Sequence, residues 1–219
     1  MVTPELGPSA QPIPRGRHAP PLEVRLEVQK HRLFAAAAIV FSKVGYAEAS
    51  AEAISRQAGM SKATFYEHFA NKEECLVALF EYAMASFLEE LVAASRGAER
   101  RFEERHSAGL HAILVSIEDN PMLAQAILVE TVGAGPRLAE LRIAALNAFA
   151  QVMYEQTVRA AELSGGPAFA SADEAFAIVG ATFELVSRQL RTGEPARLLD
   201  LQPLIERLII GLLSQPPHA

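Results

Sequence analysis

The sequence predicts an all-α protein in which a small helix-turn-helix head precedes a larger helical domain. From Leu22 onward, apolar residues recur at three- and four-residue spacing almost to the end of the chain, and no run alternates apolar and polar residues as a half-buried strand does. Breaks that contain Gly or Pro divide this pattern into segments of helical length. Two short segments on either side of Ala58-Gly59-Met60 have the spacing of two helices joined by a tight turn.

The elements of the N-terminal half follow from proline content and from residues that begin or end helices. Residues 1–21 contain six prolines and almost no apolar bulk, which predicts a disordered arm. Gly45 is expected to end the first helix as a left-handed terminator. Ser50, Ser61 and Asn71 each offer a side-chain oxygen to the free N–H groups of a following helix. The expected helices of this half cover residues 22–43, 50–57, 61–69 and 71–95.

The C-terminal half is divided by glycine and proline. Pro121 and Pro136 are placed at the first turns of helices, where the missing N–H of proline has no consequence. Residues 133–135 and 165–167 contain the Gly-rich breaks. Further helices are expected over residues 99–118, 121–131, 136–163, 171–192 and 200–214. The predicted organisation is an arm over 1–21, a helix-turn-helix domain over 22–70, and a helical effector-binding and dimerisation domain over 71–214.

Length and composition favour a globular protein. With 219 residues and 50% hydrophobic content, the chain is long enough to bury a core. Its longest strongly apolar run, residues 33–41, has nine residues, far short of the roughly 20 needed to cross a bilayer, so no membrane span is expected. The N-terminus has no apolar region typical of a secretory signal, and one cysteine cannot build a disulfide framework. We therefore expect a cytoplasmic protein.

The formal charge of −6 is unevenly distributed along the chain. Residues 1–75 hold nine Lys and Arg against eight Asp and Glu, whereas the rest of the chain holds eleven against eighteen. Affinity for phosphates comes largely from Lys and Arg, so the acidity of the second part argues against nucleic acid there. A near-neutral head can still bind DNA when its cations share one face and two heads act together. The charge distribution permits DNA binding without requiring it.

The helix-turn-helix segment carries a specific run of residues. Two such helices place the second one in the major groove of DNA. The run comprises Phe41, Gly45-Tyr46, Ser50, Ile54, Ala58-Gly59-Met60-Ser61, Thr64-Phe65-Tyr66-Glu67-His68-Phe69 and Lys72-Glu73-Glu74. In the order and spacing of these residues, which cover about 45 of the 219 positions, the chain resembles the TetR/AcrR family of transcriptional regulators. The remainder is similar to that family in length and helical character.

The resemblance implies a set of DNA contacts at the front of the second short helix and around it. Lys62, Ala63 and Thr64 would meet base edges or nearby phosphates, with Ala63 against a thymine methyl group. Phosphate contacts are expected from Ser50, Ser61, Tyr66, His68 and Lys72. Each has a structural alternative: the serines cap helices with or without DNA, the lysines can be solvated cations, and the tyrosine ring can cover the core. Phe65 and Phe69 are expected in the core.

A dimerisation surface is expected in the last two helices. One short recognition helix binds DNA weakly, and symmetric dimers overcome this by reading two half-sites. Apolar stripes on these helices would form a four-helix bundle from two copies, or alternatively close the core of one subunit. The family resemblance favours the homodimer. The expected interface residues are Phe176, Val179, Phe183, Leu201, Leu204, Ile205, Leu208 and Leu212.

An effector pocket is implied in the same domain. Its helices mix apolar bulk with isolated polar residues, as small-molecule pockets do, although the same pattern also suits plain core. By resemblance, the pocket would lie near Phe87, Leu110, His111, Leu114, Met122, Phe149, Met153 and Phe183. His106 and His111 are five residues apart rather than the four that place two imidazoles on one helical face, so no metal is expected. No catalytic or cofactor-binding motif is found, and we expect neither an enzyme nor a cofactor.

These features together favour a homodimeric transcription factor that binds a palindromic DNA operator through its head. A small, hydrophobic effector is expected to release the protein from DNA, with repression as the expected sign. Two rival hypotheses remain. One is a helical carrier or enzyme for lipophilic molecules without DNA binding, and the other is a helical adaptor that binds protein. Tight DNA retention that falls steeply with salt distinguishes the transcription factor from both rivals.

Overall fold

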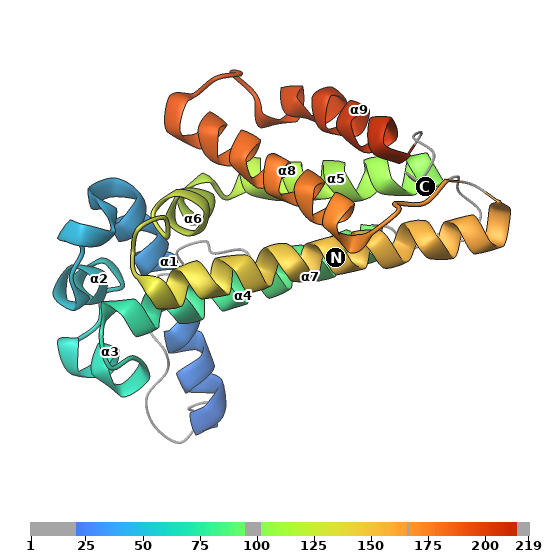
Figure 1. Cartoon of the computed structure of the whole chain (residues 1–219). Coiled ribbons are helices and arrows are strands. Elements are labelled where there is room, and N and C mark those ends of the chain that lie inside the picture. Colours follow the sequence, from blue (N-terminus) through green and yellow to red (C-terminus); the bar gives the residue numbers. More distant parts are fainter. Residues whose placement is uncertain (1–20, 95–101, 166, 214–219) are drawn as a thin grey trace. The chain divides into compact units, whose positions relative to one another are not determined.

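The computed structural model describes residues 21–94, 102–165 and 167–213, and over these residues the chain forms helices and turns without any strand (Figure 1). The all-α prediction is confirmed. The arm predicted over 1–21 lies outside the described residues except for Pro21. Contacts divide the chain into two compact units. The head unit contains the described residues up to Ala83 together with Met122–Ala134, and the helical unit contains Met84–Pro121 and the chain from Gly135 onward.

The head unit is built on a long first helix with two short helices beside it. Its elements are α1 (Leu22–Glu48), α2 (Ala51–Gln57), α3 (Lys62–His68), the first half of α4 (Lys72–Ala94), most of α6 (Pro121–Ala124) and the π-helical turn η1 (Gln125–Val129). Contacts thus place the start of α4 and residues 122–134 with the head, whereas the sequence suggested a boundary at residue 70. The expected helix over 121–131 is α-helical for one turn and then widens into the π-helical turn.

Aromatic side chains fill the core of the head unit. Phe34 of α1 stacks on Phe69 with ring centroids 5.9 Å apart, and Phe65 of α3 lies 5.5 Å from the same ring. Both Phe65 and Phe69 are buried, so their predicted place in the core is confirmed. Cys75 of α4 is also fully buried, and this burial raises the pKa of its thiol to about 12. The thiol therefore stays protonated and behaves as a small apolar group.

Gly45 breaks α1 before its last residues. Its φ of 78° confirms the predicted positive dihedral, but its ψ of 163° is extended rather than left-handed helical, a combination open almost only to glycine. Two side chains hold the backbone that follows. Glu130 Oε2 accepts a hydrogen bond from the Tyr46 N–H at 3.2 Å, and Lys72 donates to carbonyl oxygens of the same turn. The break is thus fixed by contacts from η1 and α4.

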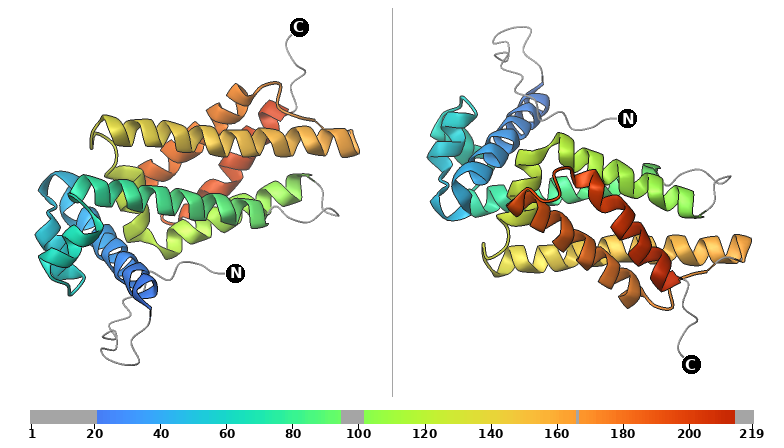
Figure 2. Two further views of the ribbon diagram at one scale, coloured as in Figure 1. Left: turned by 90° about the horizontal axis from the view of Figure 1, so that it is seen from below. Right: turned by 90° about the horizontal axis from the view of Figure 1, so that it is seen from above.

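The helical unit contains four long helices in addition to the second half of α4. They are α5 (Phe102–Asp119), α7 (Pro136–Ser164), α8 (Ala172–Thr192) and α9 (Gln202–Leu213), with a 3-10 turn η2 (Leu198–Leu201) before α9. Helix α8 packs against α7, and α9 lies beside α8 and α5 (Figure 2). The bounds follow the expected ones closely because local caps set them. Ser171, for example, accepts a hydrogen bond from the Glu174 N–H at the start of α8.

Over the described ranges, no single helix is both long and apolar enough to cross a membrane. One bent pair of helices, over His106–Asp119 and Pro121–Val129, meets the length and composition test when the two are taken together.

Candidate nucleic-acid interface

The turn between α2 and α3 is held in one conformation by local chemistry. Gly59 has a φ of 63°, where a Cβ atom is strained. The Arg32 guanidinium of α1 donates a hydrogen bond to the Ala58 carbonyl at 2.9 Å. Ser50 Oγ accepts from the Ala53 N–H at 3.1 Å, and Ser61 Oγ accepts from the Thr64 N–H at 3.0 Å. Both predicted serine caps are confirmed, and they fix where each short helix begins.

Helix α3 turns one face to the core and the other to solvent. Phe65 is buried, while Lys62, Ala63 and Tyr66 are exposed. The Lys62 ammonium lies 5.9 Å from the centroid of the Tyr66 ring, so the two side chains occupy the same exposed surface. Thr64 is half-buried, and its hydroxyl lies 2.9 Å from that of Ser61. The front of α3 therefore presents a cation, a methyl group and a phenol, with a pair of hydroxyls beside them.

His68 lies at the other end of α3 and contacts α1. Its Nε2 lies 3.2 Å from the Gln29 side-chain oxygen, and because an amide oxygen only accepts, this nitrogen carries the donated hydrogen. Burial lowers the pKa of His68, and this effect outweighs the raising effect of neighbouring Glu67. The Nε2 donor of the ring is already used. The predicted phosphate contact of His68 would require this ring to leave Gln29.

Lys72 uses its whole donor capacity inside the head unit. Its ammonium donates to the carbonyl oxygens of Tyr46, Ala47 and Ala49 at 2.8, 2.8 and 2.9 Å. It also lies 4.8 Å from the centroid of the Tyr46 ring, within cation–π range. An ammonium has three N–H donors, so none is left for a phosphate in this arrangement. In this structure Lys72 binds the carbonyl groups that follow the break in α1, and its phosphate contact stays a prediction.

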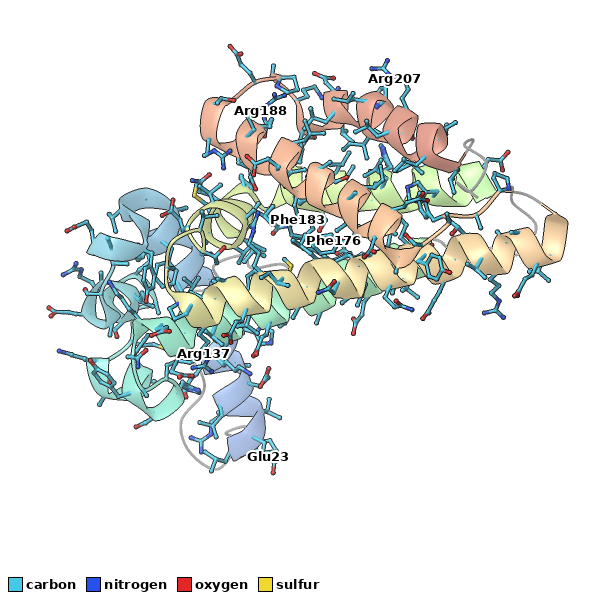
Figure 3. The ribbon with its side chains drawn as sticks, in the orientation of Figure 1. Glu23, Arg137, Phe176, Phe183, Arg188 and Arg207 are labelled. Atoms are coloured by element: carbon cyan, nitrogen blue, oxygen red, sulfur yellow. The ribbon has the colours of Figure 1, made fainter. Side chains whose placement is uncertain are left out.

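The residues predicted to bind an effector belong to both units. Phe87, Leu110, Leu114 and Phe149 are buried in the helical unit, and Met153 and Phe183 are half-buried there. Phe183 lies edge-on to Phe149 at 5.9 Å, and it points from α8 toward α7 (Figure 3). Met122 belongs instead to the head unit, where the Ser42 hydroxyl lies 3.0 Å from its sulfur. His111 lines a cavity between α5 and α9. Met122 therefore belongs to a different unit from the other residues of this set, and its effector contact stays a prediction.

The residues predicted at a dimer interface divide into two sets. Val179, Leu201 and Ile205 are buried within the subunit, which leaves them little surface for contact with a second copy. Leu204 and Leu212 are half-buried and Leu208 is exposed, all on the opposite face of α9. Phe176 points toward α7, as Phe183 does (Figure 3). Helix α8 also carries the exposed small residues Ala177 and Ala181, which were not among the predicted interface residues although their four-residue spacing is visible in the sequence.

Comparisons with known proteins agree with this geometry. Residues 33–79 match the model of a family described as bacterial regulatory proteins, tetR family. The fatty acid metabolism regulator protein of Bacillus subtilis (strain 168) is 38% identical over 56 residues, which are 26% of this chain and 29% of that protein. The chain thus spans about a quarter of the length of the curated relatives it matches.

Two solved structures share the fold over most of the chain. The fatty acid degradation regulator FadR from Bacillus halodurans has a TM-score of 0.76 at 21% identity, over 86% of this chain and 97% of that one. A transcriptional regulator FadR from Bacillus subtilis, solved in complex with stearoyl-CoA, has a TM-score of 0.72 at 20% identity, over 84% of this chain and 97% of that one. At such identities the likeness shows the fold.

The capped short helices, the glycine turn and the exposed front of α3 define a helix-turn-helix protein. The family match covers this same head, from Leu33 of α1 to Leu79 of α4. By this match, the head of the chain is similar to the tetR family of bacterial regulatory proteins.

Proposed function

We propose that this protein is a cytoplasmic transcriptional regulator that binds a palindromic DNA operator as a homodimer and leaves it when a small effector binds. The observation that carries the proposal is the exposed front of α3, which is held outward by the serine caps and by the glycine turn. Exposed polar and small side chains on a rigid second helix are what a major groove accepts. Repression is the sign we propose for its effect on transcription.

The proposed contacts are those that the exposed residues can make. Lys62 and Tyr66 reach phosphates, and Ala63 contacts a thymine methyl group. The hydroxyls of Ser50, Ser61 and Thr64 lie along the same short helices. We leave Lys72 out of the direct phosphate contacts because its three donors are already bound to carbonyl oxygens.

Removal of the Lys62 ammonium tests this interface. In the variant Lys62→Ala, DNA affinity should fall for all sequences alike, because a phosphate contact carries no sequence information. The dependence of log K on log salt should flatten by about two for a dimer, since each lost phosphate contact contributes about 0.9. Fluorescence anisotropy with the upstream DNA of the gene, at several salt concentrations, measures both quantities. Lys43→Ala, an exposed cation of α1, is the matched control, and an equal change there would contradict the assignment.

The homodimer is proposed to form through α8 and α9. Small residues on the exposed face of α8 allow a second helix to approach closely, and Leu204, Leu208 and Leu212 supply apolar area on α9. Two copies would then form the four-helix bundle expected from the sequence. The buried residues Leu201 and Ile205 stabilise each subunit instead.

A charge placed in this surface should separate the subunits. We expect Leu208→Glu to weaken dimerisation at least tenfold while the helical content stays unchanged, because Leu208 is already 39% exposed in the subunit. Analytical ultracentrifugation over a concentration series measures the equilibrium. Leu163→Glu, at the end of α7 and 81% exposed, makes the same chemical change elsewhere. A Leu208→Glu protein that stays as dimeric as this control would exclude α9 from the interface.

The effector is proposed to be a small molecule with an apolar body, bound in the helical unit. The apolar residues of that unit support this, and the FadR neighbour from Bacillus subtilis was solved with stearoyl-CoA, which has a long apolar chain. Release from DNA requires the effector to bind the conformation with low DNA affinity more tightly. The coupling free energy between the two sites is about 1–3 kcal/mol in typical cases.

A carrier or enzyme for lipophilic molecules is the alternative function. Such a protein would show no operator-specific retention in the anisotropy measurement.

A further inference from the structure

Helices α5 and α9 of the helical unit line a partly open cavity of about 590 Å³. Its apolar lining residues are Ala108 on α5 and Ile209 and Ile210 on α9. The volume lies within the range of about 300–1,000 Å³ typical of small-molecule sites, which combine apolar walls with a few placed polar groups. The polar lining residues determine which head group can bind there.

Those polar groups form a chain of hydrogen bonds that ends on one carboxylate. His111 Nδ1 lies 3.0 Å from the Gln202 side-chain oxygen, so the ring nitrogen donates and the oxygen accepts. Gln202 Nε2 donates to Glu206 Oε1 at 2.8 Å, and the Ser107 hydroxyl donates to the same oxygen at 2.6 Å. Two donors, from Gln202 and Ser107, therefore end on the same oxygen of Glu206. Glu206 keeps a second carboxylate oxygen that can accept a hydrogen bond.

The charge of the cavity also favours a ligand whose head group donates hydrogen bonds. Its described lining residues include the carboxylates of Glu104 and Glu206 and contain no Lys or Arg. His106 also lines the cavity, and burial lowers its pKa to about 4, against a smaller raising effect from Glu206. Its imidazole is thus neutral at pH 7 and adds no positive charge. Acceptors and negative charge disfavour an anionic head group and favour one that donates hydrogen bonds.

We propose that the cavity between α5 and α9 binds an organic ammonium ion with an apolar body. The ammonium group donates to the Glu206 carboxylate, and the body lies against Ile209, Ile210 and Ala108. This inference rests on the proposed function to the extent that such a cation is the effector that releases DNA. The proposed ligand differs from stearoyl-CoA, the ligand in the Bacillus subtilis structure, which carries an anionic head group.

Three probes that carry the same kind of alkyl chain but different head groups test the proposal: octylammonium, octanol and octanoate. Isothermal titration calorimetry of the full chain at pH 7 should show one octylammonium per subunit, with octanoate at least tenfold weaker. Glu206→Gln keeps an acceptor for Ser107 but removes the charge, so it should weaken octylammonium at least tenfold and leave octanol within twofold. Glu140→Gln, an exposed carboxylate on α7, is the matched control and should change neither affinity.

A second variant locates the ligand if Glu206→Gln does not fold. Ala108→Leu extends an apolar side chain into the cavity and should weaken octylammonium and octanol together, at least fivefold. Equal affinity for octanoate and octylammonium, or wild-type octylammonium affinity in the Glu206→Gln protein, would overturn the proposal. DNA retention is measured in parallel. Retained DNA without ammonium binding rejects the cavity proposal alone, whereas ammonium binding without DNA retention supports the cavity and rejects the regulator.

Discussion

Replacement of Lys72 by methionine is expected to lower the free energy of unfolding of the head unit by about 2–3 kcal/mol, because hydrogen bonds to a charged group contribute about 1.5–3 kcal/mol each and solvent replaces part of the loss. Methionine keeps the length and apolar stem of lysine but donates no hydrogen bond. The carbonyl groups of Tyr46, Ala47 and Ala49 then lose their shared cation. The turn between α1 and α2 should loosen first. Chemical denaturation followed by circular dichroism measures the change.

The same variant separates a structural lysine from one that binds phosphate. Lys62→Met is the matched control, since this exposed side chain should change stability by no more than about 0.5 kcal/mol. In DNA binding, Lys62→Met should have the larger effect of the two variants. Lys72→Met should keep the wild-type salt dependence at temperatures where the head is folded, whereas Lys62→Met should flatten it. A Lys72→Met protein with wild-type stability and a flatter salt dependence would restore the direct phosphate contact that the sequence suggested.

The helix bounds were predictable because residues close in sequence determine them. Ser50, Ser61 and Ser171 each accept a hydrogen bond from an N–H three residues later, so a cap needs only its own neighbours. The positive φ of Gly45 and of Gly59 is a property of glycine itself. The family resemblance of the head also rested on such local features. Local chemistry therefore determines the elements and the exposed front of α3.

The contacts that the sequence did not predict depend on partners distant in sequence. Lys72 binds carbonyl groups 23 to 26 residues earlier, and the lysine side chain gives no sign of where they lie. Met122 packs on the head because the segment 122–134 belongs to that unit. On α9, periodicity identified an apolar helix, but Ile205 is buried in the subunit while Leu208 is exposed. Periodicity shows that a face is apolar but leaves open which surface covers it.

Phe65 and Tyr66 are adjacent aromatic residues on opposite faces of α3, and we expect their loss to have opposite consequences. Phe65 is fully buried and lies 5.5 Å from the Phe69 ring, so Phe65→Ala should lower the free energy of unfolding by about 3–5 kcal/mol through lost burial and the cavity that remains.

Tyr66 is 50% exposed, and Tyr66→Ala should cost less than about 1 kcal/mol of stability while it weakens DNA binding several-fold through one lost phosphate contact in each head. Urea denaturation and anisotropy on the same two proteins measure both effects. Equal destabilisation by the two substitutions would mean that the Tyr66 ring belongs to the core, and the surface proposed to face DNA would then lose its phenol.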